Sequence, residues 1–189
     1  MQGAVHNMTN SKLIFKHEIP IELLAECNVS LEVLINGKLM WKKNYDGNVK
    51  HNEVIAFENE YTDAKKNKLT FLFSGNKEVE KKHFKISQIA INKQILNLYN
   101  AEYFPVINQE WWQQLNSDEK AQHQETIYGK TGSEYGWYGE INFYYCAGFD
   151  YRSHLRYNQD TTDETKLLGE KINWVYLDQS SNQIHNKIK

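Results

Sequence analysis

The stretch VSLEVLINGKLMWK, residues 29–42, decides the fold. Apolar and polar side chains alternate on both sides of Asn36-Gly37, which is typical of strands that bury one face. Asn-Gly suits a type I′ turn, because both central residues of that turn need a positive φ. We therefore predict a two-residue β-hairpin here and a sheet that grows outward from it.

Runs rich in aromatic and β-branched residues, separated by Asn, Gly and Pro, continue on either side of this hairpin. They predict further strands at residues 12–19, 53–60, 68–74, 84–91, 94–99, 140–146 and 172–177. Pro20 should end the first strand, because proline cannot donate a hydrogen bond to a neighbouring strand. Asn92-Lys93 should form a second tight turn, and residues 68–74, apolar on both faces, should lie centrally. The spacing predicts an all-β protein, an antiparallel β-sandwich of jelly-roll type.

The chain is long enough for one domain with a substantial core. We expect the sandwich to occupy residues 11–157, and a C-terminal extension or arm to occupy residues 158–189. Residues 102–139 form an excursion rich in aromatic residues and glycine, with a short helix that starts near Ser117. A further short helix is expected at residues 149–157.

The charge balance bears on the class of partner. The 22 basic and 24 acidic residues give a formal net charge of −2, which disfavours nucleic acid and anionic membranes as partners. No apolar run approaches the roughly 20 residues that span a bilayer, and the first ten residues do not resemble a secretion signal. We expect neither a nucleic-acid partner nor a membrane partner.

The sequence offers little for metal binding, and we expect no cofactor. None of the seven histidines lies two to four residues from another, and no C-x-x-C is present. Asp46-Gly47-Asn48, near Glu53, is consistent with a calcium-binding loop, but a turn is the simpler interpretation. Two cysteines are too few for a disulfide framework, although a bond between Cys27 and Cys146 stays open. Their relative position does not follow from the sequence.

Catalytic patterns are equally sparse. The chain contains no G-x-S-x-G motif and no phosphate-binding glycine loop. Hydrolysis of a glycoside needs two carboxylates across a cleft, and Glu134 and Glu140 flank an aromatic stretch. Glu102, Glu110 and Asp150 are further candidates, and nothing in the sequence selects a pair. We therefore expect a protein without a catalytic site and keep an uncharacterised hydrolase as the third alternative.

The aromatic residues of the excursion are the better candidates for function. Trp111 and Trp112 are adjacent in a polar stretch, so both indoles cannot face one interior. Trp137 and Tyr138 lie between glycines. Three interpretations stay open: rings that cap the sandwich, anchors of a protein interface, and platforms on which sugars stack.

Two resemblances accompany these patterns. Residues 29–41 with their Asn-Gly turn, 68–74 and 84–96 resemble the strand pattern of xylan-binding-type carbohydrate-binding modules. The segment from Tyr103-Phe104-Pro105 through Trp111 to GWYGEINF, residues 136–143, resembles small β-sandwich virion proteins of tailed bacteriophages. Together these resemblances imply a carbohydrate-binding-module-like sandwich used as a virion component. The chain does not match a family set of calcium or sugar ligands.

The leading hypothesis is therefore a non-enzymatic virion structural protein of the neck, tail or capsid surface, assembled in the host cytoplasm. Its partners would be other virion proteins or copies of itself, contacted through Trp111, Trp112, Trp137, Tyr138 and, in the C-terminal arm, Ile184. The alternative is a carbohydrate-binding or host-adhesion module for a host surface glycan. In that case Trp112, Trp137 and Tyr138 would be the stacking platforms.

Overall fold

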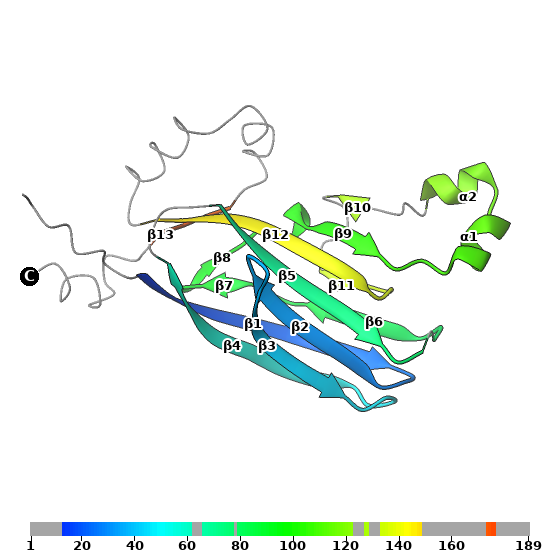
Figure 1. Cartoon of the computed structure of the whole chain (residues 1–189), viewed down its shortest axis with the longest axis horizontal. Helices are drawn as coiled ribbons and strands as arrows, with labels where there is room; N and C mark the ends of the chain where they lie inside the picture. Colours follow the sequence, from blue (N-terminus) through cyan, green and yellow to red (C-terminus); the bar gives the residue numbers. More distant parts are fainter. Residues whose placement is uncertain are drawn as a thin grey trace, which may run out of the picture.

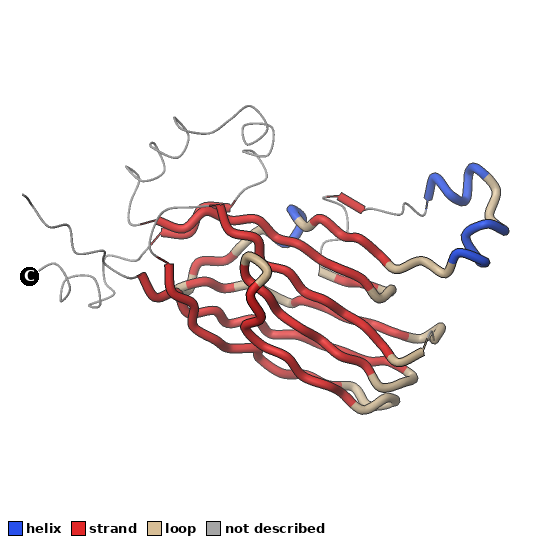
Figure 2. Tube along the Cα trace, in the orientation of Figure 1, coloured by secondary structure: helices blue, strands red, loops and turns tan. Residues whose placement is uncertain are grey.

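The computed structural model describes residues 13–61, 66–77, 79–122, 127–128, 133–148 and 173–176. These residues form two packed, largely antiparallel sheets, with two short α-helices beyond one end (Figure 1). Apart from these helices and η1 (Leu98–Asn100), the described residues form strands and the loops that join them (Figure 2). The antiparallel β-sandwich that the sequence predicts is confirmed.

The first sheet is organised around one long strand that has neighbours on both sides. Its members are β1 (Leu13–Ala25), β4 (His51–Tyr61), β6 (Lys82–Ile86), β7 (Ala90–Ile91), β8 (Gln94–Ile95) and β11 (Glu134–Tyr135). Strand β1 pairs with β4 along one edge and with β6 and β7, one after the other, along its opposite edge. Strands β11 and β8 extend the sheet beyond β6 and β7.

The second sheet carries the predicted hairpin and the later strands. Its members are β2 (Val29–Ile35), β3 (Lys38–Tyr45), β5 (Lys66–Gly75), β9 (Glu102–Pro105), β10 (Ile127–Tyr128), β12 (Gly139–Gly148) and β13 (Asn173–Tyr176). The order is β10-β9-β12-β5-β2-β3, which confirms the central place expected for β5. The helical elements are η1 (Leu98–Asn100), α1 (Gln109–Gln114) and α2 (Ser117–Gln122).

Both tight turns form where they were expected. Asn36 and Gly37 have φ of 51° and 80°, so the β2–β3 turn has the two positive angles that a type I′ turn needs. Asn92 and Lys93, with φ of 48° and 67°, turn the chain between β7 and β8 in the same way. Asparagine tolerates this left-handed region better than most residues, because its short side-chain amide can form hydrogen bonds with the nearby backbone.

The expectation that Pro20 ends the first strand is wrong. Strand β1 continues to Ala25, and Pro20 pairs with Val54 of β4. The Pro20 carbonyl accepts a hydrogen bond from the Ser87 amide, so its nitrogen faces the same edge of β1. That edge has a gap between β7 and β6, and the missing N–H of proline falls in the gap rather than in a ladder.

Two of the predicted strands are shorter than expected. The segment at residues 84–91 is divided into β6 and β7, and the one at 94–99 is reduced to β8. At the other end of the chain, β13 pairs in parallel with β12, so residues 173–176 of the expected extension belong to the sandwich. The helix expected at residues 149–157 and the arm at 178–189 lie outside the described residues.

The core lies between the two sheets and is rich in aromatic rings. Phe71 of β5 packs at 6.1 Å from Phe84 of the first sheet and at 6.0 Å from Phe143 of its own sheet, centroid to centroid. Phe73 lies 5.5 Å from Phe84. All four rings are almost fully buried, and side chains of this size supply a large share of the apolar area that a sandwich buries.

One titratable side chain, His17 of β1, is inside this core. It is 1% exposed and stacks on Phe57 with centroids 4.5 Å apart and 12° between the rings. Its Nδ1 lies 3.2 Å from the Phe15 carbonyl oxygen, and its Nε2 lies 3.4 Å from the Tyr145 hydroxyl. Burial lowers the pKa of His17 to about 4, against the opposing effect of its backbone hydrogen bonds.

His17 should therefore make the fold sensitive to acid. Its pKa is lower in the folded chain than in the unfolded chain, so the unfolded chain takes up the proton first as the pH falls. The stabilisation is complete above pH 6.5 and should be lost toward pH 4, a change of about 3 kcal/mol. Urea unfolding between pH 4 and 7 measures it.

His17→Phe keeps an aromatic ring against Phe57 and should remove this part of the pH dependence. His83→Gln is the matched control, because His83 precedes the inward-facing Phe84 and lies on the outer face of the same sheet. Equal pH slopes for the wild type and His17→Phe would contradict the role of His17.

Candidate functional site

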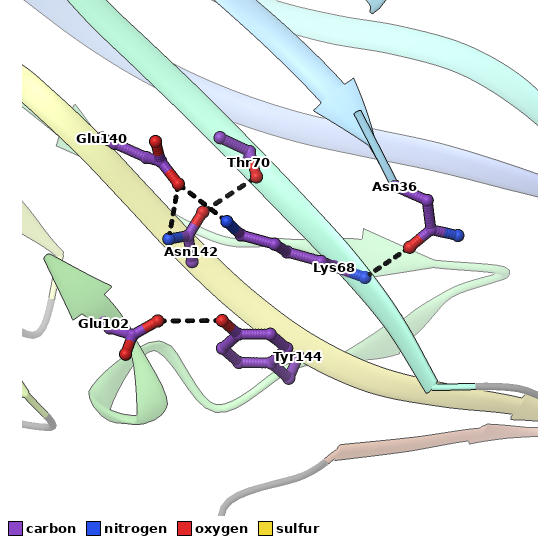
Figure 3. A network of polar contacts seen from close by, with 7 residues as sticks. All are labelled: Asn36, Lys68, Thr70, Glu102, Glu140, Asn142 and Tyr144. Carbon is purple, nitrogen blue, oxygen red and sulfur yellow. Dashed lines mark hydrogen bonds and ion pairs between the residues drawn. The ribbon is translucent and has the colours of Figure 1, made fainter. Parts of the chain in front are cut away.

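The outer face of the second sheet carries a cluster of polar side chains. Ile141, Phe143 and Tyr145 of β12 are buried in the core. Because strand residues alternate between faces, Glu140, Asn142 and Tyr144 lie on the outer side. Figure 3 shows them beside side chains of β5 and β9, and we call this cluster the polar face; its members are Lys68, Thr70, Glu102, Glu140, Asn142 and Tyr144.

The register of β12 brings these side chains together from distant parts of the chain. Asn142 pairs with Thr70 of β5 on one side and with Glu102 of β9 on its other side. Tyr144 pairs with Lys68 in the next row. Side chains paired across strands lie close enough to interact directly, so the register alone accounts for the cluster.

A chain of hydrogen bonds joins β5 to β12. Lys68 Nζ donates to Glu140 Oε1 at 2.7 Å, and Asn142 Nδ2 donates to the same oxygen at 2.9 Å. Thr70 Oγ1 donates to Asn142 Oδ1 at 2.8 Å. Asn142 is 0% exposed, so both ends of its amide have the partners that a buried polar group requires.

A second bond fixes the β9 side of the cluster. The Tyr144 hydroxyl donates to Glu102 Oε2 at 2.8 Å. Within this network of described residues, Oε2 of Glu140 and Oε1 of Glu102 accept no hydrogen bond. Each carboxylate therefore has an oxygen in place to accept a hydroxyl hydrogen from a ligand.

The first turn of the sheet also positions this cluster. Asn36, in the turn between β2 and β3, accepts the Lys68 amide with its Oδ1 at 2.9 Å. The backbone N–H of Asn36 donates to the Lys68 carbonyl oxygen, also at 2.9 Å. This reciprocal pair fixes the backbone of Lys68 at the point where its side chain reaches Glu140.

The electrostatics of the polar face favour an ionised carboxylate. The hydrogen bond from Lys68 lowers the pKa of Glu140, and burial, which would raise it, is the smaller effect. The bond from Asn142 and the charge of Lys68 lower it further. Glu140 is thus an acceptor at neutral pH and is not poised to donate a proton as a general acid.

Aromatic rings lie at both ends of the cluster. Phe104 of β9 pairs with Glu140 and is 40% exposed, and Tyr144 is half-buried at the other end. The five residues from 140 to 144 span about 13 Å along β12. The polar face is thus an elongated surface of hydrogen-bonding groups with a ring near each end.

The indoles named by the sequence form a separate cluster at the end of the sandwich. The ring centroid of Trp111 in α1 lies 6.4 Å from that of Trp112 and 5.9 Å from that of Trp137, and the Trp111–Trp137 contact is edge to face. Asn108 caps this helix by accepting from the amides of Glu110 and Trp111 at 3.0 and 3.2 Å. The structure thus brings Trp111, Trp112 and Trp137 together, and Trp111 is 37% exposed.

Tyr138 does not belong to this surface, so its expected roles as interface anchor and sugar platform need correction. The residue is 5% exposed, and its hydroxyl lies 3.1 Å from Cys27 Sγ and 3.2 Å from the Lys77 carbonyl oxygen. Its ring packs on Phe73 at 5.0 Å. Ile184, the remaining predicted contact residue, lies outside the described residues.

Of the carboxylates considered for hydrolysis, the structure brings Glu140 and Glu102 onto one face but separates Glu140 from Glu134, its first-named partner. Glu134 lies on the outer face of the first sheet and forms an ion pair with Lys85 at 3.2 Å. Glu140 is on the outer face of the second sheet, so the two point away from each other. Glu110 is on α1, and Asp150 lies outside the described residues.

The polar face is the site that the sequence analysis missed. A signal was present, since Glu140, Asn142 and Tyr144 alternate with large apolar residues and so form an outward polar line. Their partners on β5 and β9 are 72 and 42 residues away, respectively, and follow only from the strand order.

Asp46, Asn48 and Glu53 form ordinary local structure. Asn48, with φ of 62°, has the left-handed backbone of a turn residue, and its amide donates to the Ala25 carbonyl oxygen at the end of β1 at 2.6 Å. Glu53 binds Lys43 at 2.7 Å and accepts from the Tyr45 hydroxyl.

Among the described residues, no three His, Cys, Asp or Glu side chains are grouped so as to hold a metal ion. In the same residues, no helix has the length and apolar character needed to cross a bilayer.

Comparison with known proteins gives a likeness of fold only. No protein-family model and no curated protein matches the chain. The carbohydrate-binding module vCBM60 in complex with galactobiose is similar in structure, with a TM-score of 0.39 and 10% identity over 67% of this chain and 95% of that chain. A selenomethionine form of vCBM60, from work on two families of calcium-dependent carbohydrate-binding modules, is also similar. Its TM-score is 0.39, with 8% identity over 68% of this chain and 88% of that chain.

Lys68→Met should raise the pKa of Glu140 toward its ordinary value, because the hydrogen bond from Lys68 is the largest cause of the lowering. Titration of the Glu140 carboxyl carbon by NMR measures this change. Lys42→Met is the matched control, since Lys42 makes a similar bond of 2.6 Å to Glu32 of β2. A Glu140 pKa that is the same in the wild type and in Lys68→Met would exclude the coupling.

Proposed function

We propose that the protein is a non-catalytic carbohydrate-binding module that binds a short oligosaccharide over the polar face. The observation that carries this proposal is the presence on one face of Glu102 and Glu140, each with one oxygen outside the network, together with the rings of Phe104 and Tyr144. Carboxylates beside aromatic rings suit sugar recognition, because a sugar presents several hydroxyl groups and an apolar face of C–H groups.

The chemistry of the two kinds of group is complementary. An ionised carboxylate accepts strong hydrogen bonds from hydroxyl groups, and the partly exposed ammonium of Lys68 can donate to hydroxyl or ring oxygens. The exposed ring of Phe104 offers dispersion contacts to the C–H face of a sugar. The lowered pKa of Glu140 supports binding without hydrolysis, because a glycosidase acid must hold its proton near neutral pH.

Glycan-array binding followed by calorimetry tests this proposal. Glu102→Gln keeps the size of the side chain and an acceptor for Tyr144 but removes the charge. We expect roughly a tenfold weaker affinity, the scale of a hydrogen bond to a charged group. Glu58→Gln is the control, because it removes a surface carboxylate of the opposite sheet, where Glu58 lies 3.6 Å from Lys16. An array without signal would refute the proposed function.

A second candidate function is contact with neighbouring protein subunits, such as the other components of a virion. The observation in its favour is the exposure of Trp111 and of Val106, five positions before it in the chain, which is 63% exposed. Apolar side chains exposed to this degree are typical of interface anchors. Sedimentation velocity should then show association that depends on concentration and is weakened by Trp111→Ala. A monomer at all concentrations would contradict self-association.

A further inference from the structure

The backbone beyond the polar face continues as an extended line of outward side chains. Tyr103 and Ile107 are buried, whereas Phe104, Val106 and Asn108 between and beyond them are exposed. The Val106 amide donates to the Tyr138 carbonyl oxygen at 2.7 Å, so the chain stays attached to the sandwich after β9 ends. From residue 102 to residue 108 this line is about 20 Å long.

The line leads to an indole that is held in place. Trp111 packs edge to face on Trp137 at 5.9 Å, and the Trp137 carbonyl oxygen accepts the Tyr103 hydroxyl at 2.8 Å. Tyr103 is in β9 itself, so Trp111 is connected to the strand that carries Glu102 and Phe104. Helices α1 and α2 extend beyond the end of β9 (Figure 1).

The charges along this line are mostly negative. Glu102 and Glu140 belong to the polar face, and Glu110 lies next to Trp111 in α1. Lys68, the one lysine of the polar face, already forms an ion pair with Glu140. An anionic ligand would meet like charges over most of the line, whereas an uncharged ligand would lose nothing. Exposed amides at Asn108 and Gln113 add neutral hydrogen-bonding groups.

We infer that the binding site extends from the polar face along Phe104 and Val106 to Trp111, and that its ligand is an internal stretch of an uncharged, linear polysaccharide. This inference rests on the proposed function and adds a second subsite at the indole. A disaccharide would occupy only the polar face. A longer chain would also contact Val106 and Trp111.

Calorimetric titration with neutral oligosaccharides of increasing length, prepared from xylan, β-glucan, mannan and galactan, tests the length of the site. We expect affinity to rise by roughly tenfold between the disaccharide and the hexasaccharide, the gain that one anchoring ring typically provides. Trp111→Ala should remove this gain and leave disaccharide affinity unchanged. Val106→Ser should reduce the gain in the same way, and it leaves the helix intact.

Val54→Ala is the matched control, because Val54 is a similarly exposed apolar residue on the opposite sheet. Polygalacturonate and alginate test the charge argument and should not bind. Equal affinity for short and long oligosaccharides would overturn the inference while leaving the proposed function in place. Binding of the anionic polysaccharides alone would overturn the assignment of an uncharged ligand. No binding of any glycan would refute the proposed function itself.

Discussion

The pairing of β12 between β5 and β9 is the constraint on which the rest of the structure depends. Because neighbouring strand residues face opposite sides, one register serves two purposes. It places Phe143 in the core against Phe71, and it places Asn142 on the outer face between Thr70 and Glu102. A slip of one residue would exchange the two sets, expose the aromatic rings and bury the polar network without partners. The stability of the core and the composition of the candidate site are therefore specified together.

Local chemistry explains what could be predicted from the sequence. The backbone preferences of Asn36, Gly37 and Asn92 for a positive φ indicated the two turns. The apolar pattern of residues 68–74 indicated a central strand. Pro20 was misjudged because its effect depends on a neighbour: the missing N–H costs nothing where the ladder on that side is already interrupted. That interruption, between β6 and β7, has no signature near Pro20 in the sequence.

The candidate site was predicted only in part, for the same reason. Adjacent indoles in a polar segment indicated a surface role for Trp111, which its exposure supports. Tyr138 has the same flanking glycines as Trp137 but lies in the core, where Gly75 leaves room for its hydroxyl because a Cβ there would collide with it. The alternation of β12 indicated the outward line of Glu140 and Asn142, but not their partners, since those bonds cross 72 residues of chain.

Asn142 has a consequence for the thermodynamics of any association at the polar face. Its amide is fixed from both sides, and it in turn fixes Glu140, so these side chains lose their rotamer entropy when the chain folds. An incoming molecule then meets groups that need little reorganisation, and less of the interaction enthalpy is offset by ordering. The rotamer entropy of these side chains is thus lost once, when the sheet folds, whereas a flexible loop would lose it each time a molecule binds.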